Sequence, residues 1–168
     1  MPYSGCDLLS TVSPTDAELC EIFLRTRSIA VVGASPRVDR PSHEVADYLI
    51  RAGFAVHPVN PRHAGEMILG REVAGSLSEL VASGVRIDMV DIFRRSAEAG
   101  AVVDEAIAAL GGQAGVAIWM QIGVIDAAAA ARARAAGFDV VMDRCPKIEL
   151  PRLRRAGLLP SAEPAAQG

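Results

Sequence analysis

The order of hydrophobic and polar positions along the chain predicts short strands that alternate with helices. Apolar runs rich in β-branched residues, such as SIAVVGAS at residues 28–35 and AGVAIWM at residues 114–120, are typical of parallel strands buried on both faces. FAVHPVNP, RIDMVDIF and FDVVMD predict three further strands. The segments between them carry apolar residues at helical spacing, as in the stripe formed by Val45, Ala46 and Leu49.

Polar residues that can cap a helix predict where the helices begin. Thr15 followed by Glu18 forms a capping-box pattern and predicts a first helix over residues 16–26. A glycine-broken stretch predicts only a loop and a short edge strand near residues 71–73. N-caps of the four later helices are predicted at Ser42, Ser76, Ser96 and Asp126.

This alternation predicts a single α/β domain with a doubly wound, mainly parallel sheet. The expected organisation is a flexible N-terminus over residues 1–14, a ligand-binding domain over residues 15–150 that starts with an extra helix, and a partly disordered tail over residues 151–168. We find no internal repeat and no second domain.

Composition and charge narrow the class of protein without naming a partner. The 168 residues are 51% hydrophobic and 22% charged, and their net charge of −3 gives no general affinity for nucleic acid. Three cysteines show neither C-x-x-C nor zinc-like spacing. We find no signal-peptide pattern and no run of apolar residues long enough to cross a membrane. We therefore expect a soluble cytoplasmic protein with reduced thiols and no metal.

The turn after the first strand resembles a dinucleotide-binding turn that has lost glycines. Counting G-x-G-x-x-G from Gly33, the two later glycine places hold Ser35 and Val38. Arg37 and Arg40 follow, just before a predicted helix N-terminus, which is a good place for phosphate. The alternative is a solvated turn with surface arginines.

The end of the second strand speaks against ordinary NAD binding. NAD sites place an acidic residue about 20 positions after the glycines, where it binds the ribose. Here the strand ends in Val59, Asn60 and Pro61, followed by Arg62 and His63. Such a site better suits a ribose that carries phosphate, as in NADP or coenzyme A. A plain Asn-Pro turn is an equally good interpretation.

Two later strand ends complete the expected crevice, because ligands bind at the carboxyl ends of parallel strands. Phe93, Arg94 and Arg95 offer an aromatic face and two guanidinium groups, although Phe93 could belong to the core and one arginine could face solvent. Gln121 and Gly123 end the next strand, after a Trp119 that we expect in the core.

No set of catalytic residues stands out in these loops. His43, His57 and His63 lack metal-like spacing and an obvious partner. Cys145 could be a nucleophile or redox thiol if Arg144 or Lys147 lowered its pKa, but a buried, unreactive cysteine is the more frequent case.

Six pieces of sequence together resemble the small stand-alone CoA-binding proteins, which are related to the CoA-binding domain of the succinyl-CoA synthetase α subunit. They are IAVVGASP, RPSHEVADYL, PVNP, VDIFRRS, WMQIGV and VMDRCPKIE, in order over residues 29–149. The resemblance implies a Rossmann-like sheet with the nucleotide phosphates of coenzyme A at the first turn. On this basis Asn60 and Pro61 would flank the adenosine. The implied phosphate residues are Gly33, Ala34, Ser35, Arg37 and Arg40, the crevice wall is Phe93, Arg94 and Arg95, and the far lip is Gln121, Gly123 and Val124.

The resemblance implies a module that binds coenzyme A or an acyl-CoA without catalysis, because the second domain and phosphohistidine of the synthetases are not found in this sequence. Such a module would be a carrier, a sensor or the partner of an enzyme, or a homo-oligomer, with no nucleic-acid or membrane partner. Two alternatives stay open. One is an NAD(P)-binding redox enzyme or sensor that uses the same crevice, and the other is a thiol function in which Cys145 forms a mixed disulfide with coenzyme A.

Overall fold

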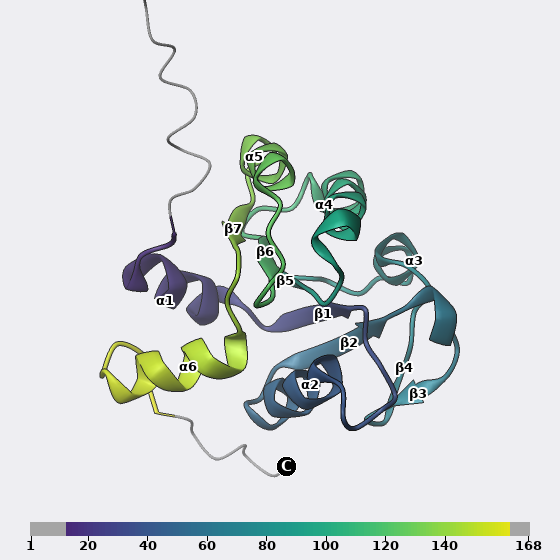
Figure 1. Cartoon of the computed structure of the whole chain (residues 1–168), viewed down its shortest axis with the longest axis horizontal. Coiled ribbons are helices and arrows are strands. Elements are labelled where there is room, and N and C mark those ends of the chain that lie inside the picture. The colour runs from purple at the N-terminus through teal and green to yellow at the C-terminus, as the bar shows by residue number, and fades with distance from the viewer. Residues whose placement is uncertain (1–12, 162–168) are drawn as a thin grey trace, which may run out of the picture.

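A five-stranded parallel sheet forms the centre of the structure, a computed structural model that describes residues 13–161 (Figure 1). The strand order is β2-β1-β5-β6-β7, so the chain starts in the interior, adds one strand to one side and then builds outward on the other. The strands are β1 (Ser28–Val32), β2 (Ala55–Val59), β5 (Met89–Ile92), β6 (Ala117–Met120) and β7 (Asp139–Val141).

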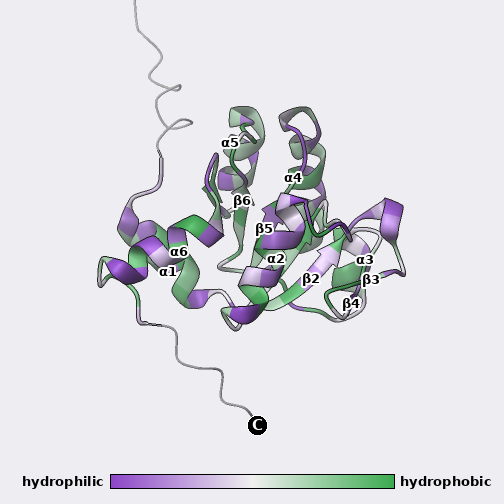
Figure 2. Ribbon diagram, turned by 60° about the horizontal axis from the view of Figure 1, so that its bottom comes forward, coloured by the Kyte–Doolittle hydropathy of each residue, from purple (hydrophilic) through white to green (hydrophobic). Residues whose placement is uncertain are grey.

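Helices cover both faces of this sheet, which confirms the doubly wound α/β prediction. One face carries α1 (Asp16–Arg25), α2 (Pro41–Arg51) and α6 (Pro146–Arg155), and the other carries α3 (Leu77–Ala82), α4 (Ser96–Leu110) and α5 (Ala127–Ala135) (Figure 1). In Figure 2 the helices α1, α2 and α6 carry both hydrophilic and hydrophobic segments, as expected for helices with one face on a sheet.

Alternation along the strands divides the interior into two cores. In β1, Ile29 and Val31 belong to the core under α1, α2 and α6, whereas Ala30 and Val32 belong to the core under α3, α4 and α5. Trp119 in β6 is fully buried, as predicted, and its indole N–H donates to the backbone oxygen of Arg144 at 2.8 Å. The central strands therefore contribute to both layers at once.

A short strand is present near residues 71–73, as predicted, but it does not lie at the edge of the main sheet. β4 (Arg71–Glu72) pairs antiparallel with β3 (Met67–Ile68) in a separate two-stranded hairpin. A single bridge between Val59 and Ala74 connects this segment to the end of β2. A turn of 3₁₀ helix, η1 (Pro61–His63), separates β2 from the hairpin.

Three of the five predicted helix caps are confirmed, whereas the caps predicted at Ser42 and Ser96 are wrong by two residues and by one residue. Thr15 caps α1 in a full capping box with Glu18, and Ser76 and Asp126 cap α3 and α5. α2 instead begins at Pro41, because proline favours the first helical position, and Ser42 lies buried in its first turn. α4 begins at Ser96 itself, which leaves that hydroxyl free to bind a neighbouring loop.

The expected boundary at residue 150 falls inside a helix. α6 runs through this position, and beyond it Leu153 is fully buried and Leu159 is 7% exposed. Residues 151–161, the first part of the tail expected to be partly disordered, are ordered, because these leucines complete the core beside α1 and α2. Residues 1–12 of the expected flexible N-terminus and residues 162–168 of the tail lie outside the described part of the chain. None of the helices in the described part is long and apolar enough to cross a lipid bilayer.

Candidate functional site

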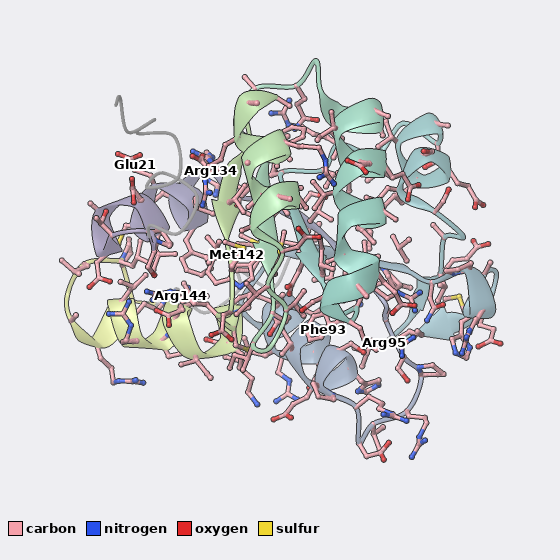
Figure 3. All side chains as sticks on the ribbon, turned by 45° about the horizontal axis from the view of Figure 1, so that its top comes forward. Glu21, Phe93, Arg95, Arg134, Met142 and Arg144 are labelled. Carbon is pink, nitrogen blue, oxygen red and sulfur yellow. The ribbon has the colours of Figure 1, made fainter. Side chains whose placement is uncertain are left out.

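A cleft with a volume of about 1080 Å³ opens at the carboxyl ends of the parallel strands. It is lined by the loops that follow β1, β2, β5 and β6, and by the first turns of α2 and α6. Figure 3 shows Phe93 and Arg95 together where α4 begins, on this edge of the sheet. Eleven predicted site residues line it, which are Gly33, Ser35, Arg37, Arg40, Asn60, Phe93, Arg94, Arg95, Gln121, Gly123 and Val124. Ala34 and Pro61 are not among the residues that line it.

Gly33 is required by a close approach of two loops. Its φ angle is +87°, and a Cβ atom at this position would lie 2.3 Å from the backbone oxygen of Phe93. Its N–H donates to the backbone oxygen of Val59 at 2.9 Å. The glycine therefore brings the ends of β1, β2 and β5 together. This position is fixed by backbone packing, whatever the ligand.

The first loop presents two arginines of unlike character. Arg37 forms a two-pronged ion pair with Asp39, with distances of 3.1 and 2.8 Å, and the arginine lowers the pKa of that carboxyl. Arg40, the N-cap of α2, is exposed and makes no ion pair within residues 13–161. Ser35 accepts a hydrogen bond from the Arg37 N–H and shapes the turn. The sequence interpretation overlooked Asp39, whose charge reduces the share of Arg37 that is available to an anion.

Asn60 is a buried structural residue in the cleft wall. Its amide Nδ2 donates to the backbone oxygen of Ala34 at 2.8 Å, and its Oδ1 accepts from the Arg62 N–H at 3.0 Å. The side chain thus fastens the first loop to the end of β2 and caps η1. Asn60 and Pro61 form a turn, and Asn60 also lines the cleft, so the two interpretations of this segment are compatible. Direct contact of Asn60 with an adenosine stays a prediction.

The loop after β5 supplies both aromatic and cationic groups. Phe93 is half-buried, contacts the core on the α2 side and also lines the cleft, so the two interpretations of this residue are compatible. Arg94 is half-buried, with Nη2 at 3.4 Å from Oδ1 of Asn60. Arg95 is 85% exposed and pairs with Glu98 at 3.3 Å. Arg94 is therefore the better positioned of the two to contact a bound ligand.

Gln121 stands over a fully buried acid. Its Nε2 lies 2.9 and 3.2 Å from the two carboxylate oxygens of Asp91, in the middle of the neighbouring strand β5. Burial raises the pKa of the Asp91 carboxyl to about 7, although the hydrogen bond from Gln121 opposes this rise. Gln121 is itself 6% exposed and lines the cleft. Because the amide nitrogen is engaged below, the amide oxygen is the group left for the cleft.

A tight turn follows Gln121 and is held from two sides. Val124 N–H donates to the Gln121 backbone oxygen at 2.8 Å, and Gly123 has φ +82°, which a type II turn requires at this place. Ser96 Oγ donates to the Gly123 oxygen and accepts from Ile125 N–H, while Asp143 accepts from Gly123 N–H at 2.7 Å. The turn is therefore a fixed part of the cleft wall.

Sequence reasoning missed the contribution of α6. Lys147 and Ile148 line the cleft, and Lys147 forms an ion pair with Glu44 of α2, which connects the two helices. The rule that ligands bind at the carboxyl ends of strands applies to the loop after β7 as well, and would have selected this segment. The other lining residues outside the predicted set are Pro41, Ser42, Glu44, Val45, Arg62, His63, Ile122 and Cys145.

Cys145 is a buried thiol in the cleft wall, with 8% of its surface exposed. Burial has the largest effect and raises its pKa above the usual value. The N–H groups of Lys147 and Ile148 lower this pKa by less, and the charges of Asp91, which raises it, and of Lys147, which lowers it, have still smaller effects. The hypothesis that Arg144 or Lys147 activates this thiol is therefore wrong. The buried cysteine expected as the more frequent case is the one observed.

Basic side chains outnumber acidic ones in the cleft lining although the chain has a net charge of −3. Glu44 is the single acidic residue that lines it among the described residues. The N-terminus of α2, with its positive dipole end, adds to the charge. The six basic residues that line the cleft are Arg37, Arg40, Arg62, Arg94, Arg95 and Lys147.

The fold and this cleft define a Rossmann-like α/β module with six basic side chains in the lining of a cleft at the carboxyl ends of its strands. Residues 27–151 match the model of a family described as the CoA binding domain. The chain therefore belongs to the family of CoA-binding domains, which confirms the resemblance to a stand-alone CoA-binding protein.

Relatives of similar size share most of the chain. The uncharacterized protein YneT of Bacillus subtilis is 37% identical over 136 residues, which cover 81% of this chain and 94% of that protein. A hypothetical protein from Pyrococcus horikoshii is 30% identical with a TM-score of 0.75, covering 92% of this chain and 99% of its own. A Thermus thermophilus protein is 32% identical with a TM-score of 0.72, covering 83% and 99%.

Proposed function

We propose that this protein binds coenzyme A or an acyl-CoA in the cleft, with the nucleotide phosphates at its basic end. The observation that carries the proposal is the group of six basic side chains around one cleft in a chain that belongs to the CoA-binding domain family. Coenzyme A has a pyrophosphate and a ribose phosphate, so it offers several anionic groups to arginine forks and to a helix N-terminus.

The proposed phosphate contacts are Arg40, Arg62 and Arg94. Arg40 and Arg62 are exposed and without an ion pair within residues 13–161, and Arg94 lines the same cleft from the loop after β5. Arg37 and Arg95 would have to leave Asp39 and Glu98 to contribute fully. Gly33, Ala34 and Ser35 would supply backbone and hydroxyl groups at the turn.

The end of β2 favours coenzyme A over NAD. An NAD site needs a carboxylate for the ribose hydroxyls there, and this cleft instead presents Asn60, Arg62 and His63. A phosphorylated ribose matches a cationic strand end, whereas an unmodified one does not. NADP shares the ribose phosphate, and is therefore the second candidate.

The proposed role is binding without catalysis, as a carrier, a sensor or the partner of an acyl-CoA enzyme in the cytoplasm. Two features of the cleft support it. The thiol of Cys145 is kept in its neutral form by burial, and His63 is paired with Glu66 at 2.9 Å. Incubation of acetyl-CoA with the purified protein should then release free thiol no faster than buffer alone.

Isothermal titration with coenzyme A and dephospho-CoA tests the proposal. Coenzyme A should bind, and dephospho-CoA should bind about tenfold more weakly, because one charge-assisted contact is worth about 1.5–3 kcal/mol. Arg40→Ala and Arg62→Ala should each weaken CoA binding by about tenfold or more. Arg51→Ala is the matched control, since Arg51 lies on α2 outside the cleft and pairs with Asp47.

Equal affinity for the two ligands would overturn the ribose-phosphate assignment. Tighter binding of NADPH than of coenzyme A, measured by NADPH fluorescence, would favour the second candidate instead. Mass spectrometry of ligand retained by the purified protein gives an independent answer.

A further inference from the structure

The two ends of the cleft differ in chemistry, and the strand order explains how. Five of the six basic residues come from the loops after β2, β1 and β5, which are adjacent in the sheet. The loop after β6 and the first turn of α6, which follows β7, contribute mainly apolar groups. A ligand that lies across the strand ends therefore passes from a cationic region to an apolar one.

Two large apolar side chains stand exposed at the second end. Ile122 is 60% exposed at the corner of the turn after β6, and Ile148 is 52% exposed in the first turn of α6. Val124 in the loop after β6 and Cys145, the N-cap of α6, are buried and also line the cleft. Burial keeps this thiol neutral at physiological pH. We call Ile122, Val124, Cys145 and Ile148 the apolar end of the cleft.

Exposed isoleucines at a cleft mouth cost free energy until a ligand covers them. The occupant must be continuous with the polyanion at the basic end, because the same cleft includes both. The far end of coenzyme A is a thiol, which carries the acyl group in a thioester. An aliphatic acyl chain is thus the part of such a ligand that would cover both isoleucines.

One ion pair, between Lys147 and Glu44, borders this end of the cleft. It bears on whether the acyl group is charged. Lys147 precedes Ile148, but its ammonium group is already paired with Glu44, which lowers the pKa of that carboxyl. A carboxylate on the acyl chain would have to displace Glu44 and would lie against apolar side chains. An uncharged chain avoids both costs.

We propose that the apolar end of the cleft binds the acyl chain of an aliphatic acyl-CoA, so that the preferred ligand is a thioester and not free coenzyme A. This inference rests on the proposed function, because the nucleotide must occupy the basic end. The predicted specificity residues are Ile122 and Ile148, which contact the chain from two different elements.

Titration of the full chain with coenzyme A, acetyl-CoA, butyryl-CoA and succinyl-CoA tests this inference. Each methylene removed from water is worth about a fourfold gain in affinity, so butyryl-CoA, which has two more methylenes, should bind about fifteenfold more tightly than acetyl-CoA. In the double variant Ile122→Ser, Ile148→Ser, the ratio of the two affinities should fall close to one. Ile125→Ser is the matched control, since Ile125 is 53% exposed in the same loop but does not line the cleft.

Each outcome separates this inference from the proposed function. If coenzyme A binds but acetyl-CoA and butyryl-CoA bind equally, the acyl site is overturned and the CoA site stands. Tighter binding of succinyl-CoA than of butyryl-CoA also overturns it. If none of the four ligands binds, the proposed function itself fails. A butyryl preference that persists in the double variant would show that other residues hold the chain, against the assignment made here.

Discussion

At the scale of single residues, Asp91 is an acid that the fold buries completely. Its carboxyl has no exposed surface, lies in a central strand between Val31 and Trp119 of the neighbouring strands, and has the amide of Gln121 as its side-chain partner. An acid in this position is most stable when protonated, which is the reason for its raised pKa. The hydrogen bonds between the Asp91 carboxyl and the amide of Gln121 fix Gln121 in the wall of the cleft.

The pKa of about 7 for Asp91 makes a prediction about stability and pH. The folded state keeps its proton between about pH 4 and 7, whereas the unfolded chain loses it near pH 4, so stability falls as pH rises through this window. The loss should approach about 1.4 kcal/mol per pH unit within it. Above pH 7 both states are ionised and this contribution becomes constant.

Urea unfolding of the protein and of Asp91→Asn at several pH values measures this effect. Asparagine can keep the contact with Gln121 but cannot titrate, so the variant should gain stability relative to the natural protein as pH rises from 5 to 7. Parallel stability profiles would contradict the raised pKa.

At the scale of elements, α6 is the part of the fold that the sequence pattern described least well. Its second half continues through Pro151, and Leu153 fills the core beside α1 and α2. The chain reverses after the helix, and Leu158 then lies 51% exposed next to the buried Leu159. The helix is therefore a structural element and a wall of the cleft at once.

Leu153→Ala should reduce the free energy of unfolding by about 2–5 kcal/mol, because it leaves a cavity in a fully buried position. Leu158→Ala removes the same atoms from an exposed position and should change it by about 0.5 kcal/mol or less. Urea or thermal unfolding of both variants gives the comparison. Equal effects would mean that α6 does not pack on the sheet as described.

The same elements show how far sequence reasoning reaches. Periodicity identified the five parallel strands, and the chemistry of Thr15, Ser76 and Asp126 located three helix starts, because these signals are local. The caps predicted at Ser42 and Ser96 are wrong, because a residue type that caps helices well can also occur elsewhere. Ser42 lies inside the first turn of α2, and Ser96 bonds to the loop after β6. The pairing of Arg37 with Asp39, the role of Asn60 as a fastener and the Lys147 ion pair with Glu44 depend on side-chain directions. A pattern of residue types does not specify these directions.

At the scale of the whole molecule, an acidic chain presents one basic cleft. The net charge of −3 repels anions at a distance, and the six basic residues attract them nearby. Such an arrangement restricts electrostatic attraction to the site itself.

Binding of coenzyme A should therefore depend strongly on salt. Raising sodium chloride from 50 to 500 mM shortens the screening length to a few ångströms and should weaken binding by about tenfold. Dephospho-CoA, with fewer charges, should lose less affinity in the same titration. A dissociation constant for coenzyme A that does not change with salt would contradict a site built on these cations.

The route of the chain through the cleft has a consequence for synthesis and folding. The lining starts at Gly33, in the first fifth of the chain, and ends at Ile148 in the last helix. A nascent chain on the ribosome therefore cannot complete the cleft until α6 has emerged and docked against α2. Ligand can stabilise the finished fold but not its early intermediates. A ligand bound in the cleft thus indicates that the chain has been synthesised and folded through α6.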